Sequence, residues 1–138
     1  MPVAERYLLD TSAVLALTDR EDGFQTVEKL LELARGGETE IVACAVTLME
    51  LYYITLQEEG DDQAAHLVGL VKAWPIRWIF PEEKELLHAG RIKAFHRLSF
   101  ADAIIAAVAR LHEAVLVHKD PEFEALAAEI PLLNLPYK

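Results

Sequence analysis

The feature that most constrains the fold is a short apolar run near the N-terminus that ends on an aspartate. Tyr7, Leu8 and Leu9 are too few to form a helix, so we interpret them as a buried strand. Asp10 follows directly, and helix-capping residues then lead into an apolar helical face over residues 12–18. This pattern predicts a strand that presents a carboxylate at its C-terminal end. In open α/β sheets, ligands bind at that edge.

Predicted strands and helices alternate along the rest of the chain. Continuously apolar runs predict strands at 41–45, 76–80 and 114–117, and a weaker one at 132–135. Helical spacing and end signals predict helices at 24–35, 47–59, 63–72, 82–97, 99–111 and 121–128. The alternation predicts a three-layer α/β/α fold with a mostly parallel sheet of four to five strands. No repeat, low-complexity tract or linker interrupts it, so we expect one domain over residues 1–138.

The composition is that of a globular domain. Hydrophobic residues make up 53% of the 138 residues, which is enough for a real core. No apolar run approaches the roughly 18–20 residues that span a bilayer, so we expect no membrane association. The N-terminus lacks the basic region and long apolar core of a signal peptide. The single cysteine, Cys44, cannot form an intramolecular disulfide. We therefore expect a cytoplasmic protein.

The charge of the chain argues against generic binding of nucleic acid. The net charge is −10, and residues 1–62 hold 4 Lys and Arg against 14 Asp and Glu, whereas residues 63–138 hold 9 of each. Phosphate contacts dominate affinity for nucleic acid, so such a chain would need a local basic patch or bound cations. Arg91, Lys93 and Arg97, just upstream of Asp102, could guide a phosphate. They could equally complement the C-terminal end of a helix dipole.

Four acidic residues lie at or just inside predicted helix starts: Asp10, Glu50, Asp102 and Asp120. Each alone has a structural explanation, because these residue types and spacings commonly cap helices. The capping patterns are Asp10 before the first helix, Thr47-x-x-Glu50, Ser99-x-x-Asp102, and Asp120 before Pro121. Capping therefore explains each acid separately.

Considered together, the four acids predict a shared site. Three of them follow strands, and a parallel sheet brings such positions to one edge. The fourth, Asp102, opens a helix whose apolar neighbours predict a buried start. Carboxylates that share a buried site raise one another's pKa and are costly unless a cation pairs with them. Oxygen ligands without a His or Cys pattern suit Mg²⁺ or Mn²⁺. Such an ion could polarise a phosphate oxygen and activate water for phosphodiester hydrolysis.

The chain resembles the PIN domain family, and its size resembles the VapC toxins of bacterial and archaeal toxin–antitoxin pairs. The matching segments are residues 8–13, 47–51, 99–107 and 117–123, in an order and spacing that cover most of the chain. The resemblance implies an endoribonuclease with one or two Mg²⁺ or Mn²⁺ ions, a cognate antitoxin and a homodimer. By position it implies that the acidic site consists of Asp10, Glu50, Asp102 and Asp120. Thr11 or Ser12 would orient Asp10 or a metal-bound water.

One position departs from the family pattern. Before the fourth acid the family usually carries a hydroxyl residue, where this chain has His118. That histidine could hydrogen-bond the substrate, although a structural role is the simpler interpretation. Glu122 lies close enough in sequence to compete with Asp120 for the fourth acidic position.

Three other functions remain open at this stage. A catalytically silent PIN-like module that binds RNA or protein would be favoured by a missing acid, and none of the four is missing. A phosphohydrolase with Asp10 as nucleophile usually needs a second Asp two residues on, where this chain has Ser12. A receiver-type phosphorylation module would pair the acids with a lysine after a late strand, for which Lys119 is a weak candidate.

Overall fold

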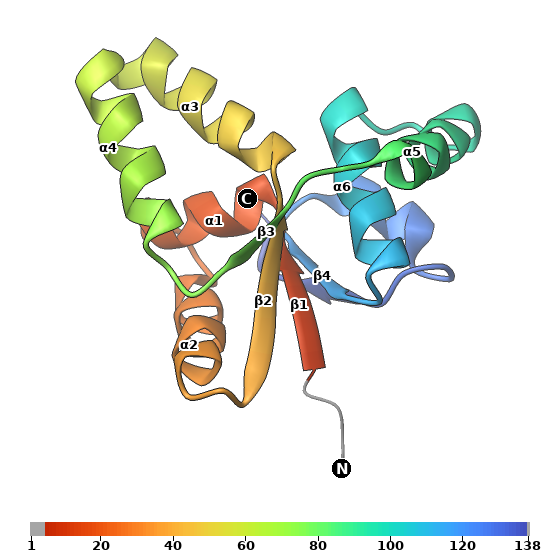
Figure 1. Ribbon diagram of the computed structural model, residues 1–138, viewed down its shortest axis with the longest axis horizontal. Helices are drawn as coiled ribbons and strands as arrows, with labels where there is room; N and C mark the ends of the chain where they lie inside the picture. The colour runs from red at the N-terminus through yellow and green to blue at the C-terminus, as the bar shows by residue number, and fades with distance from the viewer. Residues whose placement is uncertain (1–4, 138) are drawn as a thin grey trace.

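A five-stranded parallel sheet forms the centre of the computed structural model, which describes residues 5–137. The strands are β1 (Glu5–Leu9), β2 (Thr39–Cys44), β3 (Arg77–Ile79), β4 (Val115–His118) and β5 (Leu132–Asn134). They lie in the order β3-β2-β1-β4-β5, and every pairing is parallel (Figure 1). The predicted three-layer fold with a mostly parallel sheet is confirmed.

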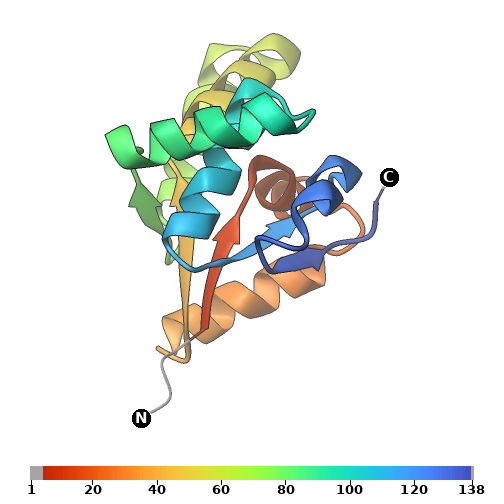
Figure 2. The same cartoon turned by 90° about the vertical axis from the view of Figure 1, so that its right-hand side faces the viewer.

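Helices cover both faces of this sheet. They are α1 (Thr11–Thr18), α2 (Phe24–Arg35), α3 (Val46–Glu59), α4 (Asp61–Lys72), α5 (Glu83–Phe95), α6 (Phe100–Leu111) and the 3₁₀ helix η1 (Pro121–Leu126). Figure 2 shows α5, α6 and η1 on the face turned to the viewer, with α2 on the opposite face. In Figure 1, α3 and α4 pair side by side and project beyond the carboxyl edge of the sheet. None of the described helices is both long and apolar enough to cross a membrane.

Side chains of the central strands alternate between two cores, because successive residues of a strand point to opposite faces. Leu8 and Val42 pack in the core under α5 and α6. Leu9, Ile41 and Val117 pack in the core under α1 and α2. Both faces are therefore buried, and this explains why the central strands read as continuous apolar runs.

The strand order reverses between β1 and β4. From β1 the chain proceeds to β2 and β3 on one side, and it later returns to β4 and β5 on the other side. Connections diverge at such a reversal, and they leave a crevice at the carboxyl ends of the strands. The N–H of Asp10 donates to the carbonyl of Val117 at 3.2 Å and so extends the pairing of β1 with β4 by one residue. Asp10 and the residues after β4 therefore lie together at this crevice.

Several boundaries differ from the predicted ones. Helix α3 begins at Val46 with Ala45 as its N-cap, and α4 begins at Asp61, two residues earlier than predicted. The segment after Asp120 is a 3₁₀ helix that ends at Leu126. These shifts are of the size expected at frayed helix ends.

Candidate active site

Asp10 is held at the N-cap of α1, with 3% of its surface exposed. Its Oδ1 accepts hydrogen bonds from the Ala13 N–H at 2.8 Å and the Ser12 hydroxyl at 2.7 Å, so the predicted N-cap is confirmed. Burial nevertheless raises the pKa of Asp10 to about 7. The hydrogen bonds oppose this rise, and the charges of Asp102 and Asp120 add to it. The ionised form of Asp10 is therefore costly in the metal-free protein.

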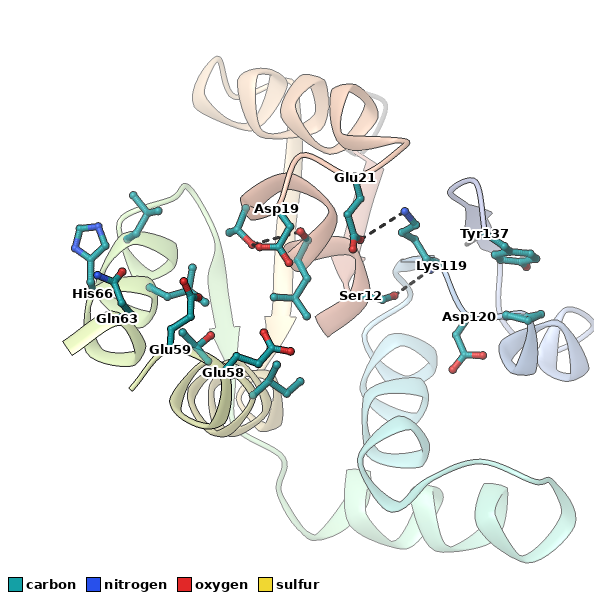
Figure 3. Close-up of a pocket in the computed structure, with 17 residues that line it drawn as sticks. Ser12, Asp19, Glu21, Glu58, Glu59, Gln63, His66, Lys119, Asp120 and Tyr137 are labelled. Atoms are coloured by element: carbon teal, nitrogen blue, oxygen red, sulfur yellow. Dashed lines mark hydrogen bonds and ion pairs between the residues drawn. The ribbon is translucent and has the colours of Figure 1, made fainter. Parts of the chain in front are cut away.

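Ser12 ties the ends of β1 and β4 together. While its hydroxyl donates to Asp10, its Oγ accepts the Lys119 N–H at 3.0 Å (Figure 3). The Lys119 ammonium points away from Asp120, donates to the Asp22 carbonyl at 2.9 Å and lies 3.6 Å from Glu21. This arrangement counts against a receiver-type module, which needs its lysine among the acids.

Glu50 is held by a hydroxyl group from a different helix. The Thr11 hydroxyl donates to Glu50 Oε1 at 2.6 Å, and Thr47 Oγ1 lies 3.0 Å from Thr11 Oγ1. The prediction that Thr47 and Glu50 form a capping box is wrong, because Thr47 lies inside the first turn of α3 and caps nothing. One turn apart, Thr47 and Glu50 share a face of α3 and meet Thr11 of α1 there. Thr11 therefore orients Glu50, whereas Ser12 orients Asp10.

Asp102, Asp120 and Glu122 form a group in which one carboxylate oxygen of each residue lies within 4.8 Å of one oxygen of each of the others. The predicted caps nearby are confirmed: Ser99 Oγ accepts the Asp102 N–H at 3.1 Å, and Asp120 Oδ1 accepts the Glu122 N–H at 2.9 Å. Both candidates for the fourth acid are thus present in one group. The three carboxylates supply an all-oxygen donor set, which suits a hard divalent cation.

The start of α6 is not buried as predicted. Phe100 is 74% exposed and Asp102 is only half-buried, and full burial begins at Ala103. The reason is that the first turn of α6 rises beyond the carboxyl edge of the sheet, where no strand lies beneath it (Figure 1). Asp102 is therefore open to solvent on one side.

Asp102 couples the acids electrostatically. Burial first, and then the charges of Glu50, Asp120 and Glu122, together raise the pKa of Asp102 to about 6. Asp102 also raises the pKa of Asp10. Within residues 5–137, none of these five carboxylates has an ion pair with a Lys, Arg or His side chain. The site thus concentrates negative charge without a protein cation to balance it.

The basic residues upstream of Asp102 have contacts of their own. The Lys93 ammonium donates to the Leu98 carbonyl at 3.0 Å and so braces the loop before α6. The Arg91 guanidinium lies 5.8 Å from the centre of the Phe95 ring. These contacts favour a structural role for Lys93. A phosphate-guiding role stays a prediction for Arg91 and Arg97.

A groove of about 720 Å³ runs from Ser12 and Asp120 across α1 to the α3–α4 pair. Figure 3 shows Asp120 and Tyr137 at one end, with Glu58, Glu59, Gln63 and His66 at the other. Its acidic lining residues are Asp19, Glu21, Glu58, Glu59 and Asp120. The sequence does not predict this groove, because Glu58 and Glu59 have the pattern of an ordinary polar helix end.

The comparisons with known proteins agree with this geometry. A PIN domain model matches residues 7–129. No curated protein sequence matches the chain. Solved structures with a similar fold include VapBC2 from Rickettsia felis bound to a DNA fragment from its promoter. The TM-score is 0.76, and the two chains are 20% identical over 95% of this chain and 99% of that chain.

Two further structures show the same fold. One is the DNA-bound VapBC from Salmonella typhimurium, with a TM-score of 0.74 and 18% identity over 96% of this chain and 98% of that one. The other is VapC20 from Mycobacterium tuberculosis, a Sarcin-Ricin loop cleaving toxin. Its TM-score is 0.68, and the two chains are 20% identical over 86% of this chain and 93% of that chain. Because the family model spans most of the chain and includes all five acids, the chain belongs to the PIN domain family.

Proposed function

We propose that the protein is a metal-dependent endoribonuclease and the toxin of a toxin–antitoxin pair. The observation that carries this proposal is the gathering of five carboxylates at the crevice where the strand order reverses, with no ion-pairing side chain among residues 5–137. Membership of the PIN domain family supports a nuclease. The folds of the VapBC complexes, and of a toxin that cleaves the Sarcin-Ricin loop, support the role of toxin.

Asp102, Asp120 and Glu122 would hold a Mg²⁺ or Mn²⁺ ion, and Asp10 and Glu50 would complete the site for one or two ions. When bound, the ion would polarise a phosphate oxygen of RNA and lower the pKa of the attacking water. The chain's own hydroxyl groups do the positioning: Ser12 holds Asp10 and Thr11 holds Glu50.

Surfaces beside the site support three partners: an antitoxin, a second copy of the chain and RNA. The acidic groove that begins at Asp120 has the charge to receive a basic segment of the cognate antitoxin. Large exposed apolar side chains support a homodimer. They are Met49, Tyr53, Phe80, Leu87, Phe95 and Phe100. RNA would approach the open side of Asp102, where Arg91 and Arg97 could contact its phosphates.

The direct test is cleavage of total RNA by the purified protein with Mn²⁺, Mg²⁺ or EDTA. We expect cleavage that depends on the metal and is lost in Asp10→Asn, because this substitution keeps the capping oxygen and removes the charge. Asp61→Asn, at an exposed acid in the first turn of α4, is the matched control and should cleave normally. Absence of cleavage by folded unsubstituted protein under every condition would favour a catalytically silent binding module.

A further inference from the structure

His118 is fully buried at the end of β4, directly before the residues of the acidic group. Its Nδ1 accepts the backbone N–H of Asp120 at 3.1 Å, and its Nε2 lies 2.7 Å from Asn134 Oδ1. Because the Asp120 N–H can only donate, Nδ1 carries no proton. Nε2 therefore carries the proton and donates it to Asn134, which makes the ring neutral in a single tautomer.

The ring of His118 is fixed from several sides. Phe123 packs against it edge-on with ring centroids 5.1 Å apart, and the Tyr137 ring lies 6.1 Å away. Asn134 is opposite His118 in the pairing of β4 with β5, so the sheet itself holds the acceptor in register. Burial lowers the pKa of His118, in keeping with the neutral ring. Asn134 of β5 thus fixes the orientation of the imidazole, and the imidazole in turn fixes the direction of the Asp120 N–H.

The contact with His118 acts on the backbone N–H of Asp120, while the Asp120 carbonyl accepts the Phe123 N–H at 3.2 Å. Neighbouring amides of the same turn have other acceptors: the Lys119 N–H bonds Ser12 Oγ, and the Glu122 N–H bonds the Asp120 carboxylate. Without an acceptor at Nδ1, the Asp120 N–H would lose its hydrogen bond at a half-buried position. The direction of the Asp120 carboxylate toward Asp102 depends on this backbone orientation.

We propose that His118 is a positioning residue that presents Asp120 to the cation through the hydrogen bond from the Asp120 N–H to Nδ1. This inference rests on the proposed function, because the position of Asp120 matters to catalysis only if the acidic group binds a metal ion.

Two substitutions separate positioning from packing. In His118→Asn the amide oxygen lies where Nδ1 lies and can accept the Asp120 N–H. In His118→Gln the longer amide reaches the position of Nε2, so it keeps the bond to Asn134 and loses the acceptor for Asp120. Both variants lose the aromatic ring against Phe123 and Tyr137, and we expect a similar fall in melting temperature for the two without metal.

The measurement is calorimetric titration with Mn²⁺. We expect His118→Gln to weaken Mn²⁺ binding by about tenfold or more, as outer contacts to metal ligands do. His118→Asn keeps the acceptor for the Asp120 N–H and loses only the bond to Asn134, so it should weaken Mn²⁺ binding no more than several-fold. Equal Mn²⁺ affinities in the two variants, whether both unchanged or both lost, would overturn the positioning role. Failure of the unsubstituted protein to bind Mn²⁺ would instead overturn the proposed function, and this inference with it.

A third variant covers the case in which replacing the buried ring unfolds the protein. Asn134 is exposed, so Asn134→Leu removes the acceptor for Nε2 and leaves the ring in place. We expect this variant to fold and to bind Mn²⁺ several-fold more weakly, because the imidazole is no longer held. An unchanged Mn²⁺ affinity in folded Asn134→Leu would also overturn the proposal.

Discussion

The inner and outer halves of the acidic site handle the same negative charge in different ways. In the inner half, the Asp10 and Glu50 carboxylates each receive a hydroxyl hydrogen bond, from Ser12 and Thr11 respectively. The outer half consists of Asp102, Asp120 and Glu122, whose oxygens crowd within 4.8 Å. The Glu122 N–H donates to the Asp120 carboxylate at 2.9 Å, and the Ser99 side chain hydrogen-bonds the Asp102 carboxylate. The protein separates the inner carboxylates with hydroxyl groups from α1, whereas it crowds the outer carboxylates in the way that a bound cation would stabilise.

The largest effect should come from the residue that couples the two halves. Asp102→Asn removes a charge that acts on both Asp10 and the outer acids. We expect RNA cleavage to fall by at least about a hundredfold, because metal ions supply several kcal/mol of transition-state stabilisation. Cleavage rates and Mn²⁺ titration measure this effect. A variant that cleaves at a normal rate would show that the halves work independently.

The inner half can be tested by removing its hydroxyl donor without changing its shape. Thr11→Val deletes the hydrogen bond to Glu50 and keeps the volume of the side chain. We expect cleavage to fall roughly tenfold to a hundredfold, with a loss of stability of about 1 kcal/mol. Thr26→Val on the exposed side of α2 is the control. Unchanged cleavage in Thr11→Val would mean that Glu50 needs no preorganisation.

Because the metal-free site raises the pKa of Asp10, the free energy of unfolding should depend on pH. The folded-state pKa of Asp10 is raised to about 7, so between about pH 4 and pH 7 the folded protein binds more protons than the unfolded chain. Metal-free stability should therefore fall as pH rises through this range. At pH 8, Asp10→Asn should be more stable than the unsubstituted protein by roughly 1–2 kcal/mol.

Urea unfolding at pH 5 and pH 8, with and without Mn²⁺, measures this difference. Mn²⁺ should raise the stability of the unsubstituted protein more at pH 8 than at pH 5, because the acids are then ionised. Metal-free stability that rises steadily between pH 5 and pH 8 would contradict the raised pKa of the inner carboxylate.

The smallest expected effect concerns salt. Among the described residues, no Lys, Arg or His side chain forms an ion pair with the five acids, so the cation rather than Lys or Arg should meet the phosphates. We expect the logarithm of the cleavage rate at subsaturating RNA to fall with the logarithm of salt concentration with a slope shallower than about −2. A steep slope would show that a basic surface carries RNA binding, and it would shift attention to Arg91 and Arg97.

Local patterns in the sequence predicted most of the fold and many contacts of the site. Capping residues such as Asp10, Ser99 and Asp120 could be identified because a cap involves neighbours within one turn. The local pattern predicts the wrong partner for Thr47, because its contact, Thr11, lies 36 residues away on another helix.

The bond between His118 and Asn134 escaped prediction for the same reason, since it depends on the pairing of β4 with β5. The exposed start of α6 also could not be read locally, because apolar residues there predict burial whether or not a strand lies beneath them. Contacts that depend on strand pairing or helix packing therefore could not be predicted from the single sequence.

The pairing of β1 with β4 has a consequence for the life of the newly made chain. Leu8 and Leu116 are direct partners, although they lie far apart in the sequence and are synthesised at different times. Until β4 emerges from the ribosome, the apolar strand β1 keeps an open edge, which is a site for mispairing and aggregation. Asp10, Glu50 and Asp102 are by then already made, but Asp120 and the Ser12–Lys119 bond are not. Completion of the acidic site and protection of this sheet edge therefore occur together, once β4 and the residues after it have been synthesised.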